Sequence, residues 1–152
     1  MTMVYSSEIL SYVAGLFDGE GSIVIAVVLP NAKRGNISPI HCLRVTLGMT
    51  HQETIQWLHN IFGGHVTQNG NGTHARHPLF LWSVVANQAQ SFLELIYPYL
   101  RYKKEQATIA IEFQKARKGR SSFRLTNETI SMREKYRTQL RQLTNGVMNL
   151  GC

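Results

Sequence analysis

Apolar residues near the N-terminus recur every three or four positions, as on one face of a helix. They are Ile9, Leu10, Val13, Leu16 and Phe17. Ser6 or Ser7 can cap the start of this helix, and Glu8 in the first turn suits the positive end of the helix dipole. Gly19 and Gly21 follow the apolar stretch, and we expect them to end the helix soon after Phe17.

Two strands are expected after this helix. Residues 23–29 are a continuous apolar run that ends at Pro30, and residues 41–49 alternate between two faces. One face of the second strand carries Leu43, Val45, Leu47 and Met49, and the other carries Cys42, Arg44, Thr46 and Gly48. The polar loop of residues 31–39 joins the two strands. The pattern predicts an antiparallel hairpin with one core face and one open face.

The middle of the chain predicts a helix followed by two more strands. Thr50 and Glu53 have the spacing of a capping box, which opens a helix through Phe62. Residues 65–68 and 79–85 have strand patterns, and the Asn and Gly residues after position 68 indicate a turn between them. Further helices are expected over residues 87–97, 99–117 and 128–143, with an Asn at position 87 and at position 127 as N-caps.

The order of these elements predicts an α+β fold, α-β-β-α-β-β-α followed by C-terminal helices. A curved antiparallel four-stranded sheet with helices on one face satisfies this order and leaves the other face open. Residues 1–117 form the expected core domain. Residues 118–152 form a basic C-terminal helical extension, in which residues 118–124 are a linker and residues 144–152 are frayed.

Composition adds a polyanionic partner to this picture. The 152 residues carry a formal net charge of +7, and nine of the 16 Lys and Arg residues lie from Lys115 onward. Such a balance favours nucleic acid as the partner, with a basic solvated tail as the alternative. No apolar run approaches the roughly 20 residues that span a membrane. The two cysteines, Cys42 and Cys152, form neither a disulfide framework nor a zinc pattern. We expect an intracellular protein, of the cytoplasm or an organelle, with no membrane contact and no small-molecule cofactor.

Two carboxylates, Asp18 and Glu20, lie at the end of the first predicted helix. They face the negative end of the helix dipole, a conflict that a bound cation would remove. Gly15 and Gly19 lie four residues apart, so one helix face has no side chains there and a second backbone can approach closely. The alternative is an ordinary helix end with a glycine turn, in which the acids serve only solubility.

Residues 13–21, Val-Ala-Gly-Leu-Phe-Asp-Gly-Glu-Gly, resemble the LAGLIDADG motif of homing endonucleases. The resemblance implies that the motif helix packs against a second copy of itself through Val13, Gly15, Leu16 and Gly19. It also implies that Glu20, with the backbone carbonyl of Gly19, holds a catalytic divalent metal. Mg²⁺ is the expected ion, with Mn²⁺ as a substitute and Ca²⁺ as an ion that binds without supporting cleavage. Since the chain has one motif and no internal repeat, the resemblance implies a homodimer.

Residues 98–107 resemble a second family segment, Pro-aromatic-Leu-basic-x-Lys-x-x-Gln-Ala, which places Lys103 at the catalytic lysine position. A polar catalytic residue, frequently Gln, is expected at the end of the second strand, and His51 stands there in this chain. The position shortly after it, where a second basic residue is often found, is Ile55. These two departures concern the groups that position water.

Double-stranded DNA is the implied partner, and the open sheet face with its loops is the expected reading surface. Its candidate residues are Val24, Ala26, Val28, Lys33, Arg34, Asn36, Ser38, Arg44, Thr46, Thr67, Asn69, Arg76 and His77. The resulting hypothesis is a site-specific homing endonuclease that cuts both strands of a long pseudo-palindromic target by Mg²⁺-dependent phosphodiester hydrolysis. The alternative is a non-cleaving nucleic-acid-binding protein of the same fold, an intron RNA maturase or a DNA-binding regulator.

Overall fold

The computed structural model describes residues 4–35, 37–69, 78–117 and 125–149. In chain order the elements are α1 (Ser7–Glu20), β1 (Gly21–Val28), the 3₁₀ helix η1 (Ala32–Arg34), β2 (Ile40–Met49), α2 (Gln52–Phe62), β3 (His65–Asn69), β4 (Leu79–Val85), α3 (Ala86–Ile96), the 3₁₀ helix η2 (Tyr97–Tyr99), α4 (Lys104–Ala116) and α5 (Asn127–Asn149). The predicted order of helices and strands and the α+β class are confirmed.

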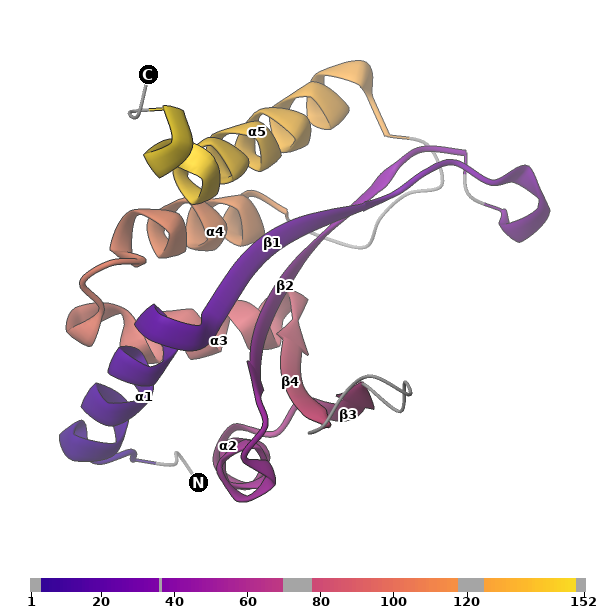
Figure 1. Ribbon diagram of the computed structural model, residues 1–152. Coiled ribbons are helices and arrows are strands. Elements are labelled where there is room, and N and C mark those ends of the chain that lie inside the picture. Colours follow the sequence, from indigo (N-terminus) through magenta and orange to yellow (C-terminus); the bar gives the residue numbers. More distant parts are fainter. Residues whose placement is uncertain (1–3, 36, 70–77, 118–124, 150–152) are drawn as a thin grey trace.

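The four strands form one antiparallel sheet in the order β1-β2-β4-β3. β1 and β2 pair from Gly21 opposite Leu47 to Val28 opposite Ile40, and they make a long curved hairpin that reaches away from the body of the molecule (Figure 1). The helices lie along one side of the sheet (Figure 1). The predicted architecture, with one covered and one open sheet face, is therefore confirmed.

The core lies between the covered face of the sheet and the helices. The strands contribute the buried residues Ile23, Ile25, Leu43, Val45, Leu47, Trp82 and Val84. Phe92 of α3 is the centre of an aromatic cluster, with ring centroids 4.8 Å from Trp82, 5.1 Å from Phe62 and 5.7 Å from Phe17. The indole N–H of Trp82 donates to the carbonyl oxygen of Gly63 at 2.8 Å, so the buried ring leaves no polar atom unpaired.

Both ends of α1 are defined by hydrogen bonds. Ser6 is the N-cap, and its hydroxyl oxygen accepts the N–H of Ile9 at 3.2 Å. The helix continues through Glu20, so of the two glycines expected to end it, Gly21 does so and Gly19 does not. Gly21 is the C-cap, and its N–H donates to the carbonyl oxygen of Phe17. Since Gly21 is also the first residue of β1, helix and strand meet without a loop.

The caps of three other helices differ from the predictions. α5 begins at Asn127 itself, and the hydroxyl of Thr126 before it accepts the N–H of Thr129 at 3.2 Å. His51, and not Thr50, caps α2, because its Nδ1 accepts the N–H of Thr54 at 3.3 Å. α3 begins at Ala86 without a side-chain cap. The predicted cap Asn87 has another use, since its side-chain oxygen accepts a hydrogen bond from Gln114 of α4 at 2.9 Å.

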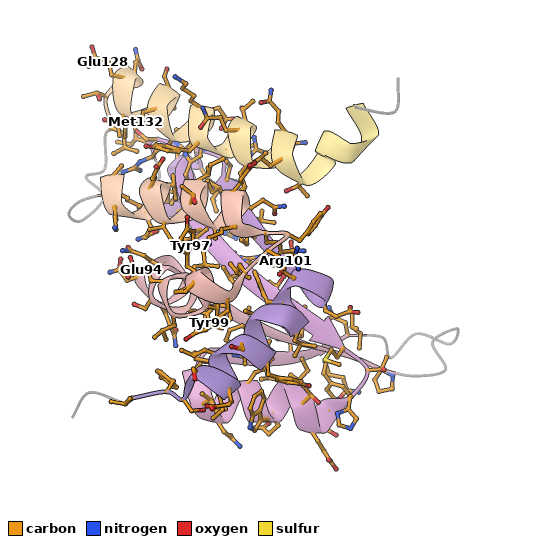
Figure 2. The ribbon with its side chains drawn as sticks, turned by 90° about the vertical axis from the view of Figure 1, so that its left-hand side faces the viewer. Glu94, Tyr97, Tyr99, Arg101, Glu128 and Met132 are labelled. Carbon is orange, nitrogen blue, oxygen red and sulfur yellow. The ribbon has the colours of Figure 1, made fainter. Side chains whose placement is uncertain are left out.

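The described part of the C-terminal extension packs onto the core. α5 lies over α4 (Figure 2), and it runs to Asn149, so the expectation that the chain frays from residue 144 is wrong. Its Leu140 is buried, and the ring of Tyr136 lies 6.1 Å from that of Phe113. Among the described residues, none of the helices has the length and apolarity to cross a membrane.

A polar contact joins α5 to the start of β2. His41 is 1% exposed, and its Nε2 lies 2.9 Å from a carboxylate oxygen of Glu134. Arg137 donates to the other carboxylate oxygen at 2.7 Å. The hydrogen bond to His41 and then Arg137 lower the pKa of Glu134, while partial burial acts in the opposite direction. The net effect is a carboxyl that stays ionised to a lower pH than usual.

We expect Glu134→Gln to lower the free energy of unfolding by about 1 kcal/mol at pH 7, a small value because the carboxylate is half-exposed. A carboxyl whose pKa is lower in the folded state stabilises the protein above its unfolded pKa and loses this effect as the pH falls through the folded value. The difference in the free energy of unfolding between variant and wild type should therefore shrink below about pH 4. Urea unfolding between pH 7 and pH 3 measures it, with Glu128→Gln on the same helix as the control. An equal loss at every pH would contradict the ionic role.

Candidate active site

The carboxylate of Asp18, near the end of α1, is held by a distant part of the chain. One oxygen accepts the backbone N–H of Arg101 and the other accepts that of Lys103, each at 2.9 Å. Arg101 lies in the short connection between η2 and α4, beside the end of α1 (Figure 2). The predicted helix from residue 99 is therefore wrong at its start, because residues 101–103 form a turn on Asp18 and α4 begins only at Lys104.

Lys103 is 8% exposed, and its ammonium group lies at the same helix end. Nζ donates to the backbone oxygen of Asp18 at 2.9 Å. A carbonyl of the last helical turn lacks a partner within the helix and carries the negative end of the dipole, so it suits a cation. Burial lowers the pKa of Lys103, while the negative charges of Asp18 and Glu20 act against this shift. The ammonium group of Lys103 thus lies at the end of the helix that carries Glu20, and its catalytic role stays a prediction.

Glu20 is exposed at the last position of α1, directly after the exposed Gly19. The Glu20 carboxylate and the Gly19 carbonyl are oxygen donors of the kind that Mg²⁺ takes. Among the described residues, no three His, Cys, Asp or Glu side chains gather as metal ligands would. The donor set of one chain therefore fits part of a metal site, and further oxygen ligands would have to come from outside the described chain.

The glycines of α1 lie on its outer side. A Cβ added at Gly15 or Gly19 would meet no other atom within 4 Å. Leu16 is partly buried against the core. Val13 is fully buried, because it faces the sheet side of the helix together with Phe17, so its predicted place in a dimer interface is wrong. Gly15 and Gly19 lie on the uncovered side of α1, where Ser11 and Tyr12 are also exposed.

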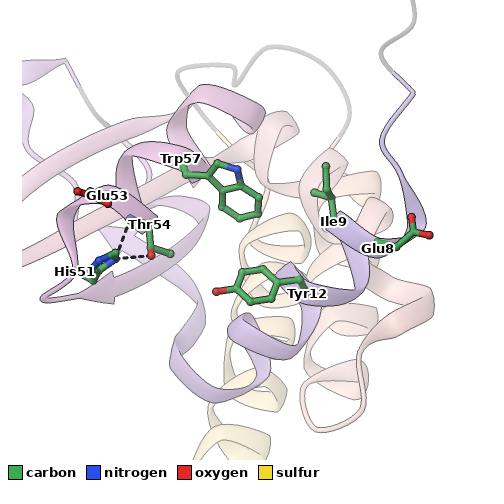
Figure 3. Close-up of a pocket in the computed structure, with 7 residues that line it drawn as sticks. All are labelled: Glu8, Ile9, Tyr12, His51, Glu53, Thr54 and Trp57. Carbon is green, nitrogen blue, oxygen red and sulfur yellow. Dashed lines mark hydrogen bonds between the residues drawn. The ribbon is translucent and has the colours of Figure 1, made fainter.

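His51 lines an open groove between α1 and α2 with a volume of about 450 Å³. Figure 3 shows its other lining residues, Glu8, Ile9, Tyr12, Glu53, Thr54 and Trp57. The rings of Tyr12 and Trp57 meet edge to face at 5.7 Å. Because Nδ1 of His51 accepts the N–H of Thr54, Nε2 is the nitrogen that carries the proton in the neutral ring. Ile55 is fully buried, so that position faces the core and not the end of α1.

The predicted reading residues of the strands share the open face of the sheet. Val24 pairs with Arg44, which pairs with Val85 on the next strand, and all three are exposed. The other predicted residues of this face are Ala26, Val28, Thr46, Thr67 and Asn69. The alternation of faces is confirmed for these strands, and contact with DNA stays a prediction.

The loop residues behave differently from one another. Lys33 and Arg34 are exposed in η1, where the side-chain oxygen of Asn31 accepts the N–H of Lys33. Ser38 is buried, and its hydroxyl accepts the N–H of Leu125 at 3.0 Å. Its predicted contact with DNA is therefore not supported, because the C-terminal extension covers it. Three further predicted contacts, Asn36, Arg76 and His77, lie outside the described residues.

Comparisons with known proteins show which of them have a similar fold. A scan against family models and a search of curated proteins each give no match. Solved structures do match, beginning with the homing endonuclease I-CvuI in complex with the I-CreI target, at a TM-score of 0.71 and 19% identity over 90% of this chain and 82% of that chain. The archaeal intron-encoded homing endonuclease I-Vdi141I in complex with DNA matches at a TM-score of 0.70 and 14% identity, over 90% of this chain and 84% of that chain. The LAGLIDADG homing endonuclease I-SmaMI bound to cleaved DNA matches at a TM-score of 0.62 and 14% identity, over 95% of this chain and 46% of that chain.

This chain has the LAGLIDADG fold. It spans more than four fifths of I-CvuI and I-Vdi141I but less than half of I-SmaMI. The extent of the match agrees with a chain that carries one LAGLIDADG motif, as the sequence indicates.

A row of polar side chains crosses the open face of this LAGLIDADG sheet beside Glu20, and the sequence analysis missed most of it. Ser22 pairs with Thr46, Thr46 pairs with Ser83, and Ser83 pairs with His65. The row can be recognised only when the strand order is known, because β4, which carries Ser83, lies between β2 and β3. The alternation of faces along residues 79–85 is the sequence pattern that could have placed Ser83 on the open face.

Gly21 leaves room for Phe17 beneath the site. A Cβ at Gly21 would lie 2.1 Å from the ring of Phe17. We therefore expect Gly21→Ala to lower the free energy of unfolding by about 1–3 kcal/mol, the usual cost of overpacking a core. Urea unfolding under monomer conditions measures this loss, with Gly15→Ala on the open side of α1 as the control. Equal stability of the two variants would show that the ring does not occupy this position.

Proposed function

We propose that the protein is a site-specific, double-strand DNA homing endonuclease that acts as a homodimer. The observation that carries the proposal is the end of α1, where the exposed Glu20 lies near the buried ammonium group of Lys103 on a LAGLIDADG fold. The solved structures of similar fold are described as homing endonucleases, and several of them contain DNA. The net charge of +7 suits the same partner, in an intracellular setting where DNA is the substrate.

Mg²⁺ is the proposed metal, held by Glu20 and the Gly19 carbonyl. Two copies of the chain would bring two such donor sets together, which supplies the ligands that one chain lacks. Structures of I-CvuI are described in the presence of Mg and of Ca. A bound divalent ion would polarise the scissile phosphate and lower the pKa of attacking water. Mn²⁺ takes the same oxygen donors and is expected to substitute for Mg²⁺.

The chain's own side chains supply the remaining chemistry. The ammonium group of Lys103 would offset negative charge that develops on the phosphate during hydrolysis. His51 would orient water through its Nε2–H, because its Nδ1 is engaged with Thr54, and this water would lie in the groove between α1 and α2. The Glu20 side chain lies where α1 ends and β1 begins, next to the polar row that starts at Ser22.

The homodimer follows from the count of catalytic acids. One chain has one Glu20, and two strands of a duplex need two centres. The uncovered side of α1 at Gly15 and Gly19 lets α1 of a second chain approach closely. A two-fold axis between the helices would relate the two reading faces, so the target would be pseudo-palindromic. The exposed residues Arg44, Lys33 and Arg34 would bind bases or phosphates on each half-site.

A non-cleaving nucleic-acid-binding protein is the second candidate, either an intron RNA maturase or a DNA-binding regulator. Its supporting observation is at α2, where Ile55 faces the core and His51 serves as the helix cap. A cleaving enzyme and a binder of this fold would both retain DNA, and they differ in the effect of changing Glu20.

We expect Glu20→Gln to abolish cleavage, by about 1000-fold or more, because the amide keeps the shape but loses the charge that holds the metal. The target is first isolated by capture from a randomised DNA library in Ca²⁺, and single-turnover cleavage is then measured in Mg²⁺. Binding to the target in Ca²⁺ should change by only a few-fold. Glu112→Gln, an exposed acid of α4, is the control. Binding without cleavage by the wild-type protein would favour the second candidate.

Gly15→Ala separates folding from dimer formation. Alanine favours a helix over glycine by about 0.5–1 kcal/mol, and its Cβ meets nothing within the chain. Unfolding of the monomer should therefore become slightly harder, while the dimer dissociates at least about tenfold more readily because the two helices are forced apart. Sedimentation at a series of concentrations measures the dimer, and thermal unfolding under monomer conditions measures the fold. An unchanged dimer would place the interface elsewhere on the chain.

A further inference from the structure

The two acids of the LAGLIDADG motif have different surroundings. Glu20 is exposed, whereas Asp18 is half-buried and both of its carboxylate oxygens accept backbone N–H groups. Because each of the two oxygens accepts one such bond at 2.9 Å, the carboxylate cannot turn to a metal without leaving a backbone N–H unpaired. Asp18 is therefore not a second metal ligand, and its charge faces the turn of residues 101–103.

Lys103 is bound by Asp18 at both of its ends. Its backbone N–H donates to the Asp18 carboxylate, and its side-chain Nζ donates to the Asp18 carbonyl, each at 2.9 Å. Both the backbone and the end of the lysine side chain are therefore hydrogen-bonded to the same residue of α1. Its ammonium group also lies 4.9 Å from the ring centroid of Tyr102. These contacts fix the ammonium group over the helix end that carries Glu20.

We propose that Asp18 is the positioning residue of the site, which sets the Lys103 ammonium group beside Glu20 by holding the backbone of residues 101–103. This inference rests on the proposed endonuclease function. Asp18 touches neither substrate nor metal in this role and acts only through Lys103. A lysine held in this way needs no ordering when substrate binds, and a displacement of about 1 Å can cost about 100-fold in rate.

The first test is Asp18→Asn. The amide keeps one oxygen, but its NH₂ group faces a backbone N–H, so one of the two hydrogen bonds is lost. We expect the single-turnover cleavage rate in Mg²⁺ to fall by about 10- to 100-fold. The dissociation constant for target DNA in Ca²⁺ should stay within about twofold, because Asp18 lies away from the reading face. The measurement is made well below the melting temperature of each variant.

The second test separates positioning from mere stability. Lys103→Ala removes the group that Asp18 is proposed to position. In that background Asp18→Asn should cost no further cleavage rate, since two residues that act as one unit are not additive. Equal losses in the wild-type and Lys103→Ala backgrounds would overturn the proposal. Glu105→Gln, an exposed acid two residues beyond Lys103, is the matched control and should leave the rate unchanged.

Amide hydrogen exchange at Arg101 and Lys103 tests the contact without any cleavage. Both amides should be protected in the wild-type protein and lose protection by at least about tenfold in Asp18→Asn. Fast exchange in the wild-type protein would overturn the proposal, whether or not the protein cuts DNA. A wild-type protein with protected amides and no cleavage would instead overturn the endonuclease function and leave the contact established.

Discussion

The packing of Phe17 against the core determines where the candidate site lies. Its ring is fully buried, 5.7 Å from that of Phe92, and fills the space beside Gly21. With this side of α1 fixed on the sheet, Gly15 must face outward, because helix faces repeat every 3.6 residues. α1 ends at Glu20, directly before the first residue of β1, so Glu20 lies where the helix meets the sheet.

Patterns that depend on neighbouring residues were readable from the sequence. Strand alternation predicted the core face of β2, with Leu43 and Leu47 inward and Arg44 outward, because successive side chains of a strand point to opposite sides. The motif placed Glu20 at the end of a helix, and the second segment placed Lys103 near it. These features need only local geometry and a resemblance that covers short segments.

Features that depend on distant parts of the chain were not readable. The motif resemblance puts Val13 in a dimer interface, whereas the residue is fully buried in the chain's own core. The phase of a helix is set by what the helix packs against, and its apolar residues alone do not show which side that is. Ser38 was assigned to DNA, but the N–H of Leu125 takes its hydroxyl. The start of α4 was misplaced because Asp18, more than 80 residues away, holds the turn before it. Polar side chains are the hardest to place, since each has several partners available.

The distance in sequence between Asp18 and Lys103 has a consequence during synthesis of the protein. The ribosome makes the N-terminal part first, so the acid of the motif exists well before the lysine that meets it. A nascent or truncated chain that stops before residue 103 contains Glu20 and all four strands of the sheet, but not the complete turn that closes on α1. The two halves of the site meet only when nearly the whole domain has folded. The pairing of Asp18 with Lys103 is therefore completed late in synthesis, after every strand of the sheet has been made.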